Sequence, residues 1–158
     1  MTGYLVLEDE SVFEGKFWGQ SSWTGIGEVV FNTSLCGYQE ILTDPSYLRQ
    51  IIVMTAPEQG NYGTHEVEME SKKIWAEGFI CVEMNQTPTD GRHTLLEFLA
   101  AYQRPALSGI DTRRLTLHLR DRGTLWGCVI QADSQEVALK KGLALIAKKK
   151  KKFSKTDW

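Results

Sequence analysis

Hydrophobic positions in the first third of the chain follow the alternating and short continuous patterns of β-strands. The turn Glu8-Asp9-Glu10-Ser11 separates two such segments, which predicts a β-hairpin. The segment Ile51 to Thr55 is apolar nearly throughout, which is typical of a strand buried on both faces. The predicted strands are Tyr4–Leu7, Val12–Trp18, Val29–Asn32, Ile51–Thr55, Phe79–Met84 and Leu125–Gln131.

Helical periodicity and end signals appear in three later segments. The first carries a capping box before an apolar stripe, the second is closed by Gly123, and the third runs towards a cluster of lysines. The alternation of strands and helices indicates an α/β domain. The predicted capping residues are Thr94 with Glu97, Asp111, and Asp133 with Glu136.

Gly25-x-Gly27 is a glycine pair without the context of a nucleotide site. It precedes a predicted strand, whereas a dinucleotide-binding loop follows one. We therefore expect a tight bend at this position, and no P-loop is present elsewhere in the sequence.

Composition is that of an ordinary globular protein of one domain. Of the 158 residues, 42% are hydrophobic and 24% are charged. No apolar run approaches the ~20 residues of a membrane-spanning helix, and the N-terminus lacks both a basic region and a cleavage site. The three cysteines lie too far apart in sequence for a metal knuckle or a disulfide framework. We expect a reduced, cytoplasmic setting with no membrane partner.

Positive charge is concentrated at one end. Removing Lys148 to Lys152 and Lys155 leaves twelve Lys and Arg against nineteen Asp and Glu in residues 1–147, a formal charge of about −7. An acidic body is a poor partner for nucleic acid, although the lysine run alone could form a nucleic-acid tail. We favour a solvated, frayed end.

The sequence contains no complete catalytic constellation. Cys81 and Cys128 lie within apolar strand patterns, where a thiol acts as a small hydrophobic group. Cys36 lies in a polar loop, and the surrounding Ser-Leu-Cys-Gly does not match the Gly-x-Cys-x-Gly elbow that presents a nucleophilic thiol. The histidines occur singly, without metal-ligand spacing: His65, His93 and His118.

The long loop that contains Cys36 belongs to the most informative segment, Gly27–Tyr47. Connections are commonly ~4–6 residues, so a longer ordered loop usually binds something. This segment, GEVVFNTSLCGYQEILTDPSY, resembles the signature of the carbamoyl-phosphate synthase small chain in its N-terminal domain. The resemblance extends over about residues 4–140. Further matches follow in order at Arg49-Gln50-Ile51, Gly60-Asn61-Tyr62-Gly63, Glu77-Gly78-Phe79, Gly109–Thr116 and Gly127-Cys128-Val129-Ile130.

The resemblance implies a fold and an assembly. It implies an α/β domain of the layered β/β/α (swivelling) type over residues 1–147, followed by a lysine-rich tail, 148–158. The family continues into a glutamine amidotransferase domain, which this sequence lacks. It further implies a cytoplasmic heteromer with the large synthetase chain, acting in arginine and pyrimidine synthesis. Glutamine would be hydrolysed on the small chain, and ammonia would pass to the large chain.

The resemblance also implies where the chemistry lies. No cofactor is expected in this domain, because ATP and magnesium would belong to the large chain. The glutaminase nucleophile would belong to a Gly-x-Cys-x-Gly elbow in the amidotransferase domain, so this fragment alone is predicted to be inactive. No catalytic residue is therefore assigned here.

One residue of this chain is a candidate contact for L-glutamine. The family's Asp-Pro-Ser-Tyr serine contributes to glutamine binding, and the matching residue here is Ser46. A hydroxyl on a proline-fixed turn presents both a donor and an acceptor. The residues alone favour a plainer role, in which Ser46 only caps the turn.

Other signature residues leave alternatives open. Asn32, Thr33 and Ser34 can satisfy backbone groups of the loop. Arg113 and Arg114 follow Asp111, so each could form a local ion pair or reach a partner subunit. For the whole chain, the alternatives are a stand-alone protein-interaction domain and a nucleic-acid-binding module driven by the lysines.

Overall fold

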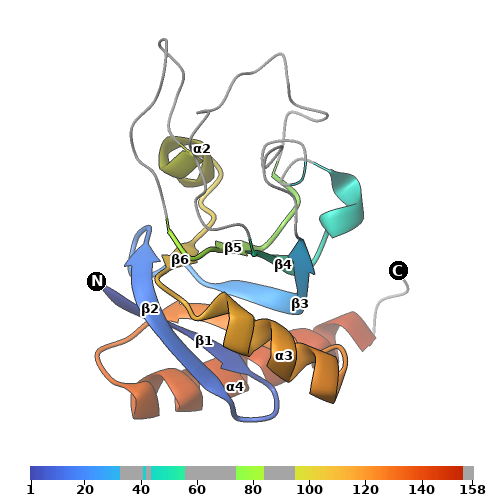
Figure 1. Cartoon of the computed structure of the whole chain (residues 1–158). Coiled ribbons are helices and arrows are strands. Elements are labelled where there is room, and N and C mark those ends of the chain that lie inside the picture. The colour runs from blue at the N-terminus through green and yellow to red at the C-terminus, as the bar shows by residue number, and fades with distance from the viewer. Residues whose placement is uncertain (33–40, 42–43, 56–73, 84–94, 155–158) are drawn as a thin grey trace.

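Strands of the structure close into a barrel. The computed structural model describes residues 1–32, 41, 44–55, 74–83 and 95–154. Within these residues, seven strands follow the order β1-β2-β6-β5-β4-β3-β7, and β7 pairs with β1 (Figure 1). The elements are β1 Thr2–Leu7, β2 Val12–Trp18, β3 Gly25–Asn32, η1 Pro45–Tyr47, β4 Gln50–Met54, β5 Gly78–Ile80, α2 Leu95–Ala101, β6 Ala106–Ser108, α3 Thr112–Arg122, β7 Trp126–Gln131 and α4 Gln135–Ser154.

The barrel combines an antiparallel half with a parallel half. β1 and β2 form the predicted hairpin, with Val6 opposite Val12. β3, β4, β5 and β6 pair in parallel, with Val29 opposite Ile51 at the first of these pairings. Residues 51–54 of β4 are fully buried, which confirms the prediction of a strand covered on both faces.

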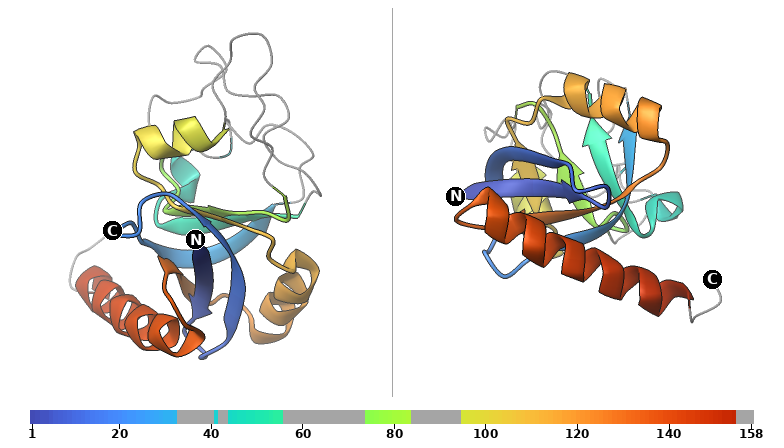
Figure 2. Two further views of the ribbon diagram at one scale, coloured as in Figure 1. Left: turned by 90° about the vertical axis from the view of Figure 1, so that its left-hand side faces the viewer. Right: turned by 90° about the horizontal axis from the view of Figure 1, so that it is seen from below.

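Three apolar clusters account for this burial. The first fills the barrel and takes Leu115 and Leu119 from α3. The second packs Leu99 of α2 against β4, β5 and β6. The third packs Ala138 and Ile146 of α4 against β1 and β7. Both views of Figure 2 place α3 and α4 on opposite sides of the β1–β2 hairpin.

Gly25 and Gly27 lie inside β3, so the prediction of a tight bend at this pair is wrong. A Cβ atom on Gly25 would lie 2.5 Å from the carbonyl oxygen of Glu77, and one on Gly27 would lie 2.8 Å from the carbonyl carbon of Arg49. Real Cβ atoms essentially never come this close to backbone. The glycines therefore let β3 approach the chain entering β4 and β5.

The helix caps partly follow the predictions. The Asp111 side chain accepts the Arg114 N–H at 3.0 Å, and Gly123 ends α3 with a φ of 80°. At α4, however, Ser134 Oγ accepts the Val137 N–H at 3.3 Å, so Ser134 takes the role that was predicted for Asp133. The predicted cap Thr94 of α2 lies outside the described residues.

Strand predictions were incomplete in the middle of the chain. β6 was not predicted, although all three of its residues are buried. The strand predicted to reach Met84 is described only as β5, which ends at Ile80, and Met84 lies outside the described residues. β6 completes the ring by pairing with β2 on one side and β5 on the other.

The lysine run belongs to α4, which continues to Ser154, so the prediction of a frayed end is wrong. Lys150 Nζ lies 2.7 Å from Glu8 Oε2 in the hairpin turn. The predicted boundary between residues 147 and 148 falls within this helix. The layered, swivelling β/β/α class stays a prediction. Among the described residues, no helix combines the length and apolar composition that crossing a bilayer requires.

The close approach at β3 predicts the effect of a single methyl group. Gly27→Ala should lower the free energy of unfolding by about 1–3 kcal/mol, because a methyl group there meets backbone that cannot rotate away. Gly78→Ala in β5 is the matched control, since its Cβ would meet Val129 Cγ2 at an ordinary 3.4 Å. Urea unfolding of both variants measures the difference. Equal losses would contradict the argument.

Candidate functional site

The turn that carries Ser46 is held by Asp44. Asp44 is the N-cap of η1 and its Oδ1 accepts the Ser46 backbone N–H at 2.9 Å. Pro45 occupies the first helical position, where its fixed φ suits the turn. The Leu48 N–H then donates to the Pro45 carbonyl at 3.1 Å. Asp44 therefore supplies the cap that the plainer interpretation assigned to Ser46.

The Ser46 side chain is exposed and makes no hydrogen bond to another described residue. Its neighbour Tyr47 is half-buried against the cluster under α2, and the Tyr47 hydroxyl accepts from Asn32 Nδ2 at 3.2 Å. One side of the turn is thus fixed to the barrel, while the serine hydroxyl has both its donor and its acceptor capacity available to a ligand.

The turn is anchored beside the C-terminal ends of two parallel strands. At these ends, the Thr55 N–H donates to the Asn32 carbonyl at 3.1 Å. Thr55 Oγ1 donates to the same oxygen at 3.3 Å. The contact between Tyr47 and Asn32 thus holds the serine turn beside the end of β3.

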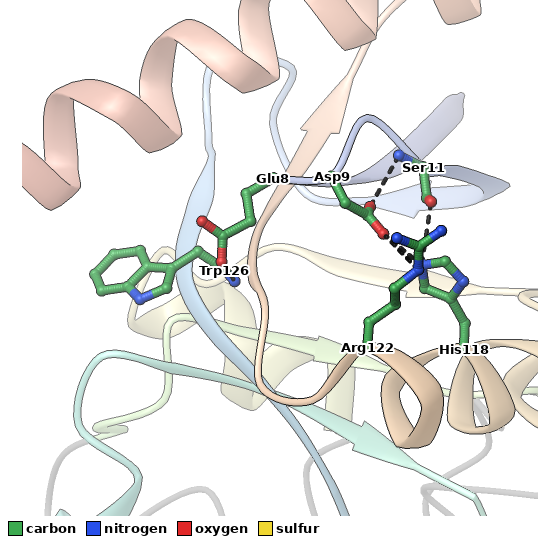
Figure 3. A network of polar contacts seen from close by, with 6 residues as sticks. All are labelled: Glu8, Asp9, Ser11, His118, Arg122 and Trp126. Carbon is green, nitrogen blue, oxygen red and sulfur yellow. Dashed lines mark hydrogen bonds and ion pairs between the residues drawn. The ribbon is translucent and has the colours of Figure 1, made fainter.

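A second polar group joins the β1–β2 turn to α3 (Figure 3). Asp9 Oδ2 lies 2.7 Å from His118 Nε2, and Ser11 Oγ lies 3.1 Å from the same nitrogen. The Ser11 N–H donates to Asp9 Oδ1 at 3.1 Å, and Arg122 Nε lies 3.9 Å from Asp9. This arrangement was missed from sequence, because more than one hundred residues separate its two halves.

Ser11, His118 and Asp9 share residue types with a hydrolase triad but not its geometry. In a triad, one ring nitrogen takes the serine proton while the other is oriented by the carboxylate. Here the serine and the carboxylate both contact His118 Nε2, so the carboxylate competes with the hydroxyl for one position. The group fastens the hairpin to α3 and is not arranged for nucleophilic catalysis.

Glu8 extends the fastening to two further elements. Glu8 Oε1 accepts the Trp126 N–H of β7 at 2.8 Å, and its other oxygen pairs with Lys150 of α4. One four-residue turn therefore holds α3, β7 and α4 together.

Burial raises the pKa of the two described thiols. Cys81 and Cys128 are fully buried, and desolvation brings the pKa of each to about 12, with the charge of Glu83 adding to the shift at Cys81. The prediction that both act as small hydrophobic groups is confirmed by this burial. Within the described part of the chain, no three His, Cys, Asp or Glu side chains form a metal-binding group.

The structure separates the roles of the two arginines that sequence left open. The Arg114 guanidinium lies 4.2 Å from the centroid of the Phe13 ring, a cation–π contact within the domain. Arg113 is exposed, and no described carboxylate pairs with it. Other residues singled out in the sequence fall outside the described residues. They are Thr33, Ser34, Cys36 and Gly37 of the signature, the later match 60–63, and the histidines His65 and His93.

Comparison with known proteins gives one consistent family. The family model "Carbamoyl-phosphate synthase small chain, CPSase domain" matches residues 5–129. The carbamoyl phosphate synthase small chain of Streptomyces coelicolor is 49% identical over 123 residues, which are 77% of this chain and 32% of that protein. The small chain of Escherichia coli K12 is 44% identical over 137 residues, 85% of this chain and 36% of that protein. The chain thus spans about a third of the length of these curated relatives.

A solved structure matches more weakly. A peptidase M28 precursor from Shewanella amazonensis gives a TM-score of 0.44 at 10% identity and covers 81% of this chain and 33% of that one. This likeness is too low to indicate a shared fold or activity.

The fastening at Asp9 predicts a pH-dependent stability. Burial opposes its ionisation, but hydrogen bonds from the Ser11 N–H and from His118 outweigh that effect, so the pKa of Asp9 lies below its ordinary value. The charged form therefore stabilises the folded state above the unfolded pKa of about 3.9. This contribution is lost as the pH falls through the lower folded pKa.

Asp9→Asn should lower the free energy of unfolding at pH 7 by about 1 kcal/mol or less, because the pair is partly exposed. The difference from wild type should begin to shrink as the pH falls below about 4, and it should vanish once the pH is below the lower folded pKa of Asp9. Urea unfolding at several pH values measures it, with Glu10→Gln in the same turn as the control. A difference that persists unchanged at pH 2.5 would show that the charge of Asp9 is not its cause.

Proposed function

The chain belongs to the carbamoyl-phosphate synthase small chain family, and we propose that it is the N-terminal domain of the glutaminase subunit of a glutamine-hydrolysing carbamoyl-phosphate synthase. In that enzyme, the amidotransferase domain of the small chain releases ammonia from glutamine. The large chain then combines ammonia with bicarbonate in an ATP-dependent reaction. This domain contributes binding and positioning.

The observation that carries the proposal is the Asp44-held turn with its exposed serine. Because Asp44 satisfies the Ser46 backbone N–H, the Ser46 hydroxyl is not needed to cap the turn. A rigid turn whose hydroxyl is not used within the described structure suits the recognition of an amino-acid ligand. The turn is already ordered in the folded domain, so binding loses little further conformational entropy. We assign Ser46 a contact to L-glutamine across the boundary with the amidotransferase domain.

The rest of the described structure supports a binding role in which this domain supplies no catalytic side chain. Cys81 and Cys128 are buried with raised pKa values, so neither thiol is suited to attack an amide. His118 is committed to the hairpin fastening. We assign the nucleophile to the amidotransferase domain, and ATP and magnesium to the large chain, as the family resemblance implies.

The partners follow from the same proposal. They are the large chain, the amidotransferase domain and L-glutamine, in a cytoplasmic complex that serves arginine and pyrimidine synthesis. A nucleic-acid partner is not proposed, because residues 1–147 carry about −7 in formal charge and Lys150 pairs with Glu8.

Ser46→Ala in the complete small chain, assembled with its large chain, should lower kcat/KM for glutamine. A loss of about tenfold is expected for one hydrogen bond to a charged amino-acid ligand. Ammonia-dependent synthesis should be unchanged, because it bypasses the glutamine site. Steady-state rates with each nitrogen source measure the two activities.

Ser22→Ala, which alters an exposed serine in another turn, is the matched control. Equal loss of both activities on Ser46→Ala would mean that Ser46 supports the fold. Unchanged glutamine kinetics would remove Ser46 from the site.

A further inference from the structure

The turn that carries Ser46 is held more firmly than a simple connection between strands requires. None of the three residues of η1 is buried, so apolar burial alone does not fix the turn. Directional contacts fix it instead, because Asp44 caps its start and the Tyr47 hydroxyl accepts from Asn32 Nδ2 at 3.2 Å. Surface connections usually keep more freedom than this. The rigidity of the turn therefore points to a function.

Tyr47 is the link between the turn and the barrel. Its ring packs against the apolar cluster under α2, which includes Ile52 and Met54 of β4. Its hydroxyl contacts Asn32, whose carbonyl in turn accepts from the Thr55 N–H at 3.1 Å and from Thr55 Oγ1 at 3.3 Å. In Figure 1, η1 lies beside β3 and β4. A phenylalanine ring could fill the same space, so the hydroxyl adds a fixed direction and not burial.

The far end of the turn is fixed by strained backbone. Arg49, which follows the turn, has a φ of 66°, in the left-handed region that favours glycine. Its carbonyl accepts the Glu28 N–H of β3 at 3.1 Å. A residue other than glycine keeps this conformation only where its surroundings impose it, and such residues cluster at ligand-binding sites. The backbone on both sides of Ser46 is thus held in one geometry relative to β3.

We propose that Tyr47 is a positioning residue for glutamine, which through its contact with Asn32 fixes the Ser46 hydroxyl at the place where the ligand binds. The two residues are neighbours in one short helical turn, so releasing the Tyr47 side chain lets the serine move relative to the barrel. A hydrogen bond weakens steeply as its distance and angle depart from the optimum. This inference rests on the proposed contact between Ser46 and L-glutamine, and it gives Tyr47 no contact of its own with the ligand.

Steady-state kinetics of the complete small chain with its large chain test the role through Tyr47→Phe, which keeps the packed ring and removes only the hydroxyl. The KM for glutamine should rise about threefold, the effect of one weakened hydrogen bond. The kcat at saturating glutamine should be unchanged, because only binding is weakened. In a Ser46→Ala background, Tyr47→Phe should raise the KM no further, since the hydroxyl that it positions is absent.

Tyr102→Phe is the matched control, because Tyr102 is a second tyrosine half-buried against the same cluster. A wild-type KM in Tyr47→Phe, or the same rise in Tyr102→Phe, would overturn the proposal. An equal rise with and without Ser46 would overturn it as well, because Tyr47 would then act independently of the serine. If Ser46→Ala alone left the KM for glutamine unchanged, the proposed function would fail, and the positioning role with it.

Discussion

The close approach of β3 to the chain entering β4 and β5 is the constraint on which the rest of the structure depends. Side chains at Gly25 and Gly27 would collide with the carbonyl groups of Glu77 and Arg49, so glycine is the only residue that lets the strands come together here. Without this approach β3 could not pair with β4 on one edge and β7 on the other. Closure of the barrel therefore determines where the serine turn can lie.

In the closed barrel, the two faces of β3 meet different neighbours at the C-terminal end of the strand. Asn32 connects through Tyr47 to the serine turn, while Phe31 lines a cavity against α3. The buried leucines of α3 fill the barrel, and its exposed face lines that cavity. The hairpin turn holds α3 in place through His118.

Local chemistry predicted the parts of the fold that depend on neighbouring residues. The β1–β2 hairpin and both ends of α3 follow from turn and cap residues that act within a few positions. At α4, Asp133 was predicted as the cap, but the neighbouring Ser134 takes that role, which is a small error in reading a local signal. β6 was missed because its three residues are too few to show a period, and pairing with β2 and β5 stabilises it.

Long-range contacts account for the remaining errors. The glycines of β3 looked like a bend because their neighbours in space, Glu77 and Arg49, are distant in sequence. The lysine run looked frayed because its partner Glu8 lies 142 residues away. For the site, the family signature identified Ser46. The exposure of its hydroxyl and the cap from Asp44 could be recognised only from the structure.

The central claim is that the Asp44-held turn presents Ser46 to glutamine. An experimental structure of the complete small chain with its large chain and bound glutamine tests it most directly. We expect Ser46 Oγ to lie within hydrogen-bond distance of the glutamine, about 2.5–3.2 Å from one of its polar atoms. A glutamine molecule bound without contact to Ser46, with the Ser46 hydroxyl turned to its own backbone, would contradict it.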